Sequence, residues 1–421
     1  MRSTRSFTFS CLALVVLVAL SGQAFSTTVA VGTCTGLVHF ATIQLAVNSV
    51  PAGSIIDICP GTYPEQVAIN KNLTLKGVVA GGQDAAVIVA PAGGLVPNAN
   101  SLATGNAIAA QILVQAPATA VKFNNLTVDG SNNGIAGCLP NPIGFYYQNA
   151  SGTISRTSVL NEVLGTGLTG CQGGLGIFVQ SGGGGTSTVS ITNNNVENYQ
   201  KNGITANEAG TTATITGNTV IGQGPTSGAA ENSIQIGFGA TGTISGNTVG
   251  SDVWSPDVFG DTGDAAAGLL VYASSHVTIS SNNVNNTQFG IALAGDPTSG
   301  SADYNTVTKN TVSATHFYDG IDLCGNNNNA TSNIINGSDE SGVHVDDSCN
   351  TGAAGNTATS NTINSACAGI LIGPTASSST TAPNTYFNVG RLQLSGTNVC
   401  TPALSPVKKS AVAKALSAAR P

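Results

Sequence analysis

Charged side chains are scarce in this chain. They make up 8% of its 421 residues, and the 13 Lys and Arg residues are outnumbered by 20 Asp and Glu residues, which leaves a net charge of −7. A chain with so few cations has no basic stripe, which argues against nucleic acid as a partner. Disorder is also disfavoured, because 41% of the residues are hydrophobic. We therefore expect a folded protein that does not bind nucleic acid.

Sulfur and imidazole ligands are also rare. The chain has one Met and four His, so copper is a poor expectation. No two of its nine cysteines have the two-residue spacing typical of zinc sites. Carboxylates are the remaining ligands, and they could hold Ca²⁺, a cofactor that the sequence leaves open.

A hydrophobic run long enough to cross a membrane is missing. The apolar run at 11–20 follows Arg2 and Arg5 and precedes small residues up to Ser26. That order is typical of a secretory signal peptide, and the run is short for a membrane anchor, which is the alternative. We predict a signal peptide over 1–26 and a secreted protein, extracellular or periplasmic, with no membrane span after cleavage.

Glycine is abundant, with 53 residues, and two short patterns repeat from Val121 onward. The first is apolar-x-x-Asn-x-apolar, as in ITNNNV and ISGNTV, and the second is Gly-apolar-x-apolar, as in GITA and GIDL. Their spacing is irregular, which argues against a solenoid of fixed repeat length but suits a β-helix, whose turns absorb extra residues. The Asn positions of the first pattern are Asn124, Asn194, Asn218, Asn247, Asn282, Asn310, Asn333 and Asn361.

Strands this short cannot stand alone, so each is expected to stack on its equivalent in the next coil, about 4.8 Å away. Alternation sends apolar residues inward and the residue between them outward, and stacked Asn side chains can hydrogen-bond along the stack. Most outward positions of the second pattern are unreactive, and the pair Asp322 and His344 is the exception. These positions are Phe178, Thr205, Gln235, Leu270, Ala292, Asp322, His344 and Leu371.

Stacking also bears on the cysteines. Removal of Cys11 with the signal peptide leaves eight, an even number in an oxidising compartment, so disulfides are expected. The sequence alone does not determine their pairing, and stacking favours neighbours in the sequence. The favoured pairs are Cys34–Cys59, Cys138–Cys171, Cys324–Cys349 and Cys367–Cys400.

The stretch 40–78 starts the stack. Helical spacing over 40–49 stops at Pro51, and short strands follow at 55–58, 66–69 and 73–75. The run FATIQLAVNSVPAGSIIDICPGTYPEQVAINKNLTLKGV resembles the N-terminal lid and first coil of secreted pectin-lyase-like proteins. The resemblance implies an all-β protein, a right-handed single-stranded parallel β-helix of about ten coils with a capping helix. We place this domain at 27–400, followed by a basic C-terminal tail at 401–421.

Reactive side chains gather at 316–347, in two adjacent coils of the expected stack. Carboxylates this close perturb each other's pKa, as acid–base chemistry requires. They could cleave a glycosidic bond or hold Ca²⁺, and a solvated polar face is the alternative. The candidate catalytic residues are Asp319, Asp322, His344, Asp346 and Asp347, with Asp319 or Asp322 as the acid and His344 as the base. The candidate substrate-binding residues are His316, Tyr318 and the only Trp, Trp254, which lies in an acidic insertion at 251–264.

Two motifs in this patch carry further resemblances. YDGIDL resembles the N-T-D-G-I-D-I motif of polygalacturonase-like hydrolases, which implies that Asp319 is the catalytic acid, although Ser341 stands where a second Asp belongs. SGVHVDDS resembles the region around the Asp-Pro-His-Asp motif of mannuronan epimerases, with a different residue order.

The pectin-lyase-like fold hosts lyases, esterases, hydrolases, epimerases and non-enzymes, so the fold does not determine an activity. The favoured function is a monomer that binds or processes an extracellular polysaccharide. As an enzyme it would be a polysaccharide lyase, a glycoside hydrolase or a uronan epimerase. The alternative is a non-catalytic, disulfide-stabilised surface or matrix/adhesion protein.

Overall fold

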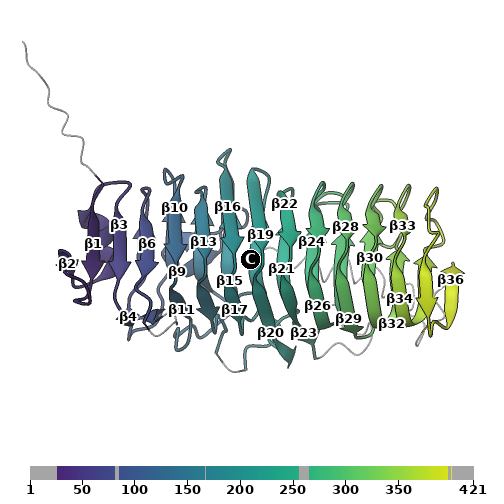
Figure 1. The fold of residues 1–421 in the computed structure, drawn as a ribbon, viewed down its shortest axis with the longest axis horizontal. Coiled ribbons are helices and arrows are strands. Elements are labelled where there is room, and N and C mark those ends of the chain that lie inside the picture. The colour runs from purple at the N-terminus through teal and green to yellow at the C-terminus, as the bar shows by residue number, and fades with distance from the viewer. Residues whose placement is uncertain (1–25, 81–84, 166, 256–264, 397–399, 401–421) are drawn as a thin grey trace, which may run out of the picture.

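The computed structural model describes residues 26–80, 85–165, 167–255, 265–396 and 400. The predicted signal peptide, apart from Ser26, and the predicted tail at 401–421 lie outside the described residues. Within them the chain forms 36 strands and one helix, α1, Ile43–Ser49. The coils stack along one long axis from the N-terminal to the C-terminal end (Figure 1). The chain is therefore a right-handed parallel β-helix, as predicted.

Each coil contributes strands to three faces. The first face is a 13-stranded sheet in which equivalent strands of successive coils pair in parallel. Its strands, in spatial order, are β2 (His39–Phe40), β1 (Thr28–Val31), β3 (Ile55–Ile58), β6 (Thr74–Gly77), β10 (Val121–Asn124), β13 (Gly152–Ser155), β16 (Ser187–Thr192), β19 (Thr211–Thr216), β22 (Thr241–Ser245), β25 (Thr278–Ser280), β28 (Thr306–Thr308), β31 (Asn329–Thr331) and β33 (Thr357–Thr359).

The second and third faces are joined at a corner by two strands that run across both, β32 (Ile334–Val345) and β34 (Thr362–Ile372). The second face has β4 (Gly61–Pro64), β7 (Ala86–Val89), β11 (Thr127–Asp129), β14 (Ser158–Leu160), β17 (Asn195–Glu197), β20 (Thr219–Thr226), β23 (Thr248–Trp254), β26 (Asn283–Thr287), β29 (Thr311–Thr315) and β35 (Thr385–Phe387). The third face has β5 (Val67–Ile69), β9 (Ala107–Gln115), β12 (Asn141–Gln148), β15 (Leu175–Gln180), β18 (Asn202–Asn207), β21 (Asn232–Gly237), β24 (Ala267–Tyr272), β27 (Phe289–Ala294), β30 (Ile321–Cys324) and β36 (Arg391–Ser395). The short strand β8 (Ala99–Asn100) pairs antiparallel with β9.

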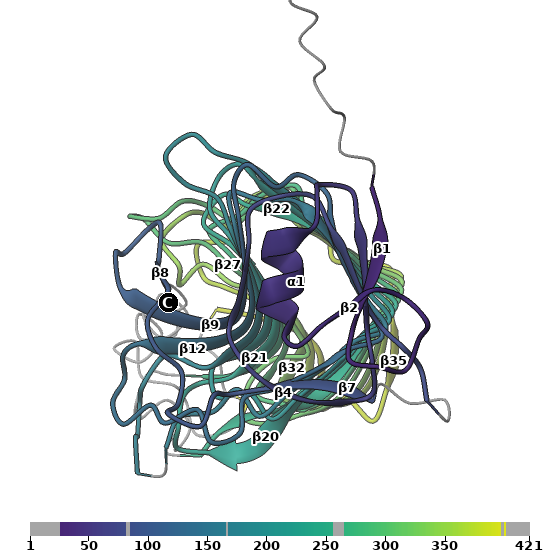
Figure 2. The same ribbon diagram turned by 90° about the vertical axis from the view of Figure 1, so that its left-hand side faces the viewer.

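Helix α1 lies across the open N-terminal end of the coils (Figure 2). It begins three residues later than the start of the predicted helical spacing, because Thr42 is the N-cap and its Oγ1 accepts a hydrogen bond from the Leu45 amide. The carboxylate of Glu65 accepts two more amide hydrogen bonds of the first turn. Ile43 and Val47 face the interior and are buried, so the helix closes the end of the apolar core.

The register confirms the predicted inward and outward positions of the third face. Phe178 pairs with Thr205 in the next coil, and Asp322 pairs with His344. The apolar residues beside them belong to one continuous interior core. The outward row is buried as well: Thr205 and Gln235 have no accessible surface. The third face is therefore more enclosed than a solvated sheet face would be.

Asparagines form a continuous ladder inside one corner, as predicted. Each side chain donates from Nδ2 to the next Asn Oδ1 at 2.9–3.1 Å, from Asn194 to Asn384. Asn124 is not part of it: it pairs in register with Ser155 and bonds the Ser155 hydroxyl instead. The pattern at 121 is therefore out of register with the other copies. A second set, Asn305, Asn328 and Asn356, which the sequence analysis did not single out, caps backbone amides at another turn.

The glycine of the Gly-apolar-x-apolar pattern has a packing reason. At Gly176 an added Cβ would lie 2.6 Å from the Gly203 carbonyl oxygen and 2.7 Å from Val196 Cγ1. At Gly320 the same atom would lie 2.8 Å from the Gly342 carbonyl oxygen. Stacked coils therefore leave no room for a side chain in this column, because the backbone of the next coil occupies the space.

Replacing Gly176 with alanine is expected to lower the free energy of unfolding by about 1–3 kcal/mol, the usual range for overpacking. The measurement is chemical denaturation followed by circular dichroism. Gly36→Ala is the matched control, because an added Cβ there meets nothing within 4 Å, and its effect should stay within about 0.5 kcal/mol. Equal stability of the two variants would contradict the packing explanation.

Four disulfides link the pairs that stacking favours. They are Cys34–Cys59, Cys138–Cys171, Cys324–Cys349 and Cys367–Cys400. Each closes a loop of similar length, with a sequence separation of 25 or 33 residues. Each bond removes conformational freedom from the unfolded chain, and together they reinforce both ends of the stack.

Candidate functional site

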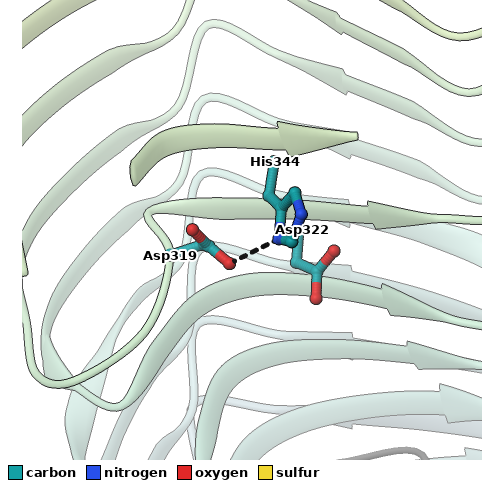
Figure 3. A group of neighbouring side chains, drawn as sticks. All are labelled: Asp319, Asp322 and His344. Atoms are coloured by element: carbon teal, nitrogen blue, oxygen red, sulfur yellow. Dashed lines mark hydrogen bonds and ion pairs between the residues drawn. The ribbon is translucent and has the colours of Figure 1, made fainter. Parts of the chain in front are cut away.

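The site is built on two neighbouring coils of the third face. Asp322 is the outward residue of β30, and His344 is the outward residue of β32 directly opposite it. Asp319 lies just before β30, in the turn that joins it to the second face. The spacing of parallel strands brings the three side chains together (Figure 3), with one ligand atom of each within 4.8 Å of the others.

Asp319 positions the histidine. Its Oδ2 lies 3.1 Å from His344 Nδ1, while its Oδ1 accepts hydrogen bonds from the Ser341 amide at 3.1 Å and the Ser341 hydroxyl at 2.5 Å. The carboxylate is buried, and Ser341 and His344 are its hydrogen-bond partners. Ser341, which stands where the polygalacturonase-like motif has an aspartate, therefore belongs to this arrangement. The one-coil register between β30 and β32 is the signal that could have shown it.

Two buried polar atoms of the cluster have no hydrogen-bond partner: Asp322 Oδ1 and His344 Nε2. Asp322 and His344 are each only 4% exposed. A buried polar atom without a partner is costly in free energy and calls for an explanation. A ligand bound between these two atoms could supply the partners that they lack.

The electrostatics of the cluster are dominated by carboxylates. Burial disfavours a charged imidazole, but Asp346, Asp319 and Asp322 outweigh it and raise the pKa of His344 to about 10. Burial and, next, the charge of Asp346 raise the pKa of Asp322 well above its ordinary value, although His344 opposes the shift. As the structure stands, His344 carries a proton at neutral pH, which does not match the role of base predicted for it.

The two aspartates after β32 differ in position. Asp346 belongs to the cluster, because its Oδ1 lies 3.8 Å from His344 Nε2, and Ser348 holds its carboxylate from the amide and the hydroxyl. Asp347 is bonded instead to the amide and the hydroxyl of Thr375 at 2.6 Å. We therefore keep Asp346 and leave Asp347 out of the site.

The predicted substrate-binding rings do not form an exposed platform. Tyr318 is buried and stacks on Phe289, with ring centroids 4.4 Å apart. Trp254 is 5% exposed at the end of β23, so it does not present its ring face to solvent. His316 is half-buried, and its Nε2 lies 2.8 Å from Asn286 Oδ1. The rest of the acidic insertion, 256–264, lies outside the described residues.

A second acidic group, which the sequence analysis missed, lies inside the coils. Asp252 falls within the acidic insertion expected at 251–264, but it lies in β23 and is fully buried. Tyr199 donates to its Oδ1 at 2.7 Å, and Ser233 Oγ lies 2.5 Å from its Oδ2. Burial raises the pKa of Asp252 to about 8. Only the coil register brings these residues together, since they come from three coils.

The C-terminal part of the chain, residues 260–388, matches the family model described as "Periplasmic copper-binding protein (NosD)". No curated protein matches the chain. Among the described residues, no helix is long and apolar enough to cross a membrane.

Solved β-helix structures are similar in fold. The catalytic domain of a GH87 α-1,3-glucanase in complex with nigerose has a TM-score of 0.61 at 14% identity, over 88% of this chain and 66% of that one. The Dettilon tailspike protein (gp208) has a TM-score of 0.56 at 14% identity, and the match covers 81% of this chain and 61% of the tailspike chain. The GH136 lacto-N-biosidase from Eubacterium ramulus has a TM-score of 0.55 at 11% identity, and the match covers 88% of this chain and 67% of the biosidase chain. The chain thus spans about two thirds of these proteins, and at such identities the likeness concerns the fold.

The donors of the cluster do not suit copper(I), which prefers thiolate and thioether ligands. The cluster offers one imidazole and carboxylates, and the described cysteines are all disulfide-bonded. The family description therefore carries no copper chemistry to these residues. Fold and comparisons together identify the chain as a right-handed parallel β-helix protein whose C-terminal third is similar to the NosD family.

Proposed function

We propose that this protein lies outside the cytoplasm, binds an extracellular polysaccharide and cleaves it at the cluster of Asp319, Asp322, His344 and Asp346. Asp322 and His344 are the residues that would contact the sugar. Asp319 and Ser341 are positioning residues, because they hold the imidazole from the opposite side. The four disulfides agree with an oxidising compartment.

One observation carries the proposal. Along the outward row of the third face, from Phe178 to Leu371, Asp322 and His344 are the ionisable positions, and they are adjacent. Carboxylates and imidazole are the side chains that most often transfer protons in catalysis. A purely structural stack has no need for unpartnered polar atoms at that point, because an apolar pair would pack at lower cost.

The comparisons support a glycan as the substrate class. Two of the similar folds are named for enzymes that act on glycans, an α-1,3-glucanase and a lacto-N-biosidase. Their low identity leaves the particular glycan open. Cleavage adds water across the glycosidic bond, with the hydroxyl going to the anomeric carbon and a proton going to the leaving oxygen.

The rival function is a non-catalytic surface or matrix protein. The Asn ladder and the disulfides favour it, because both increase durability without chemistry. The two proposals differ in one respect: only the catalytic one makes the Asp322 carboxyl group essential.

Asp322→Asn is expected to reduce glycan cleavage by at least about 100-fold, the usual loss when a group that transfers a proton is removed. The measurement is release of reducing ends from a panel of neutral and acidic polysaccharides. Asp339→Asn is the matched control: Asp339 is an exposed neighbour whose Oδ2 accepts the Phe317 amide, an acceptor that Asn retains. Cleavage by Asp322→Asn at the wild-type rate would move the site elsewhere, and no cleavage by the wild type of any glycan would favour the rival.

A further inference from the structure

The cluster has the arrangement of a metal site. His344 donates from Nδ1 to the Asp319 carboxylate, and its Nε2 has no hydrogen-bond partner. Asp322, whose Oδ1 also has no hydrogen-bond partner, belongs with His344 and Asp319 to one group of possible metal ligands (Figure 3). We infer that His344 Nε2, Asp322 and Asp346 bind a divalent first-row metal ion such as Zn²⁺ or Mn²⁺, with Asp319 outside the coordination shell.

Asp319 accepts a hydrogen bond from the His344 ring, as carboxylates outside the coordination shell do for metal-bound histidines. The hydrogen bond at 3.1 Å keeps one imidazole proton on Nδ1, so a metal ion would bind at Nε2 and displace the second imidazole proton. Carboxylate–histidine–metal arrangements of this kind fix both the tautomer and the orientation of the ring. Ser341 in turn holds Asp319 through two hydrogen bonds, so the ligand is oriented before an ion arrives.

The distances suit a small ion. His344 Nε2 and Asp346 Oδ1 are 3.8 Å apart. Ligands about 2.0–2.1 Å from a tetrahedral zinc ion lie about 3.3 Å from each other, so these two atoms would have to approach by about 0.5 Å. Three protein ligands would leave one coordination position for water or substrate, as in catalytic rather than structural zinc sites.

The charge of the cluster favours a cation. The groups that act on Asp322 are the carboxylates of Asp346, Asp319 and Glu340 and the single imidazole of His344. So much buried negative charge around one imidazole is costly, and a divalent ion offsets it. A mixed nitrogen and oxygen donor set suits Zn²⁺ and Mn²⁺ better than Ca²⁺, which prefers oxygen ligands.

This inference deepens the proposed function, on which it rests only for the role of the ion. A bound ion would polarise a sugar oxygen or a water molecule at its open position, and Asp322 would then act by holding the ion rather than by transferring a proton itself. Binding of the ion itself does not require a glycan, so the two proposals can fail separately.

The test is isothermal titration calorimetry of the chain without residues 1–26, after treatment with EDTA, with Zn²⁺, Mn²⁺ and Ca²⁺ as separate probes. We expect one Zn²⁺ per chain, weaker Mn²⁺ and the weakest response to Ca²⁺. His344→Gln and Asp322→Asn should abolish Zn²⁺ binding, and Asp319→Asn should weaken it by about 10–100-fold. Asp339→Asn should bind as the wild type does. Cu²⁺ is not an informative probe, because it binds almost any such donor set more tightly than Zn²⁺.

Circular dichroism and the unfolding midpoint of each variant without metal show whether the fold is intact. Zn²⁺ should raise the midpoint of the wild type and leave that of His344→Gln unchanged. No Zn²⁺ binding by the wild type would overturn the inference, as would equal binding by a folded His344→Gln variant. Zn²⁺ binding without cleavage of any glycan would retain the metal site and overturn the proposed function. Cleavage that persists in EDTA would retain the proposed function and overturn the role of the ion in it.

Discussion

Asp252→Asn is expected to remove a loss of stability of about 5 kcal/mol that the wild type suffers between pH 4 and pH 8. The pKa of Asp252 is about 8 in the folded chain, whereas an unfolded Asp titrates near 3.9. Between these values the unfolded state has released the proton and the folded state has kept it. Stability therefore falls as pH rises, by about 1.4 kcal/mol per unit, and levels off above pH 8.

Asparagine should keep the hydrogen bonds of the protonated acid. Its Oδ1 can accept from Tyr199, and its Nδ2 can donate to Ser233 Oγ, which in turn donates to the Val220 carbonyl. Only the titration is lost. Some slope should remain, because burial and the charge of Asp252 also raise the pKa of Glu231, which is buried nearby.

The measurement is guanidinium unfolding at pH values from 4 to 9, with extrapolation to water. The control is Glu197→Gln, which removes a carboxyl group from an exposed position of β17 and should keep the wild-type slope. A wild-type slope in Asp252→Asn would mean that Asp252 is not the group that holds the proton.

Asn247→Ala is expected to destabilise the chain by about 3–5 kcal/mol, because it interrupts the Asn ladder between Asn218 and Asn282. Asn247 Oδ1 accepts from the backbone amide and the side chain of Asn218. Its Nδ2 donates to the Ile215 carbonyl and to Asn282. Alanine leaves the Asn218 amide and the Ile215 carbonyl buried without these partners, at about 1–3 kcal/mol each.

Asn285→Ala is the matched control, since it removes an exposed Asn from β26 of the adjacent coil, and it should change the unfolding free energy by less than about 0.5 kcal/mol. Asn247→Asp distinguishes the contribution of the amide oxygen from that of the amide nitrogen. An aspartate oxygen still accepts hydrogen bonds from Asn218, but no group donates to the Ile215 carbonyl. This variant should also be strongly destabilised, through a buried charge. If Asn247→Ala costs no more than Asn285→Ala, the ladder does not contribute to stability as described.

The coil repeat could be predicted because its cause is local and recurrent. Alternation within each short strand decides which side chains point inward. A residue type that repeats in every coil lies beside the same residue type of the next coil when the coils stack. For that reason the outward row through Phe178, Asp322 and His344 could be predicted from the sequence, and stacking favoured the four disulfide pairs that the structure contains. Asn124 was wrongly expected in the ladder. The sequence at 121 matches the pattern, but its strand pairs in a register that places Asn124 beside Ser155 instead of at a ladder position.

The candidate site could be predicted in position but not in chemistry. The adjacency of Asp322 and His344 follows from the repeat, but hydrogen-bond partners depend on turns, whose lengths are irregular. The turn before β30 aims Asp319 at Nδ1 of His344, and the turn after β32 brings Asp346 toward Nε2 and sends Asp347 to Thr375. Adjacent aspartates in the sequence thus have different roles.

The repeated sequence pattern predicted the β-helix and its Asn ladder and favoured the disulfide pairs, because each depends on the stacking of equivalent residues from coil to coil. Only the tertiary structure decided which polar groups are buried and what they face. Trp254 and Tyr318 are enclosed rather than exposed, and Asp252 points into the coils rather than into the acidic insertion. The physical reason is that burial and pKa depend on the distance to other coils and on how completely the third face is covered, and neither is encoded in a local pattern.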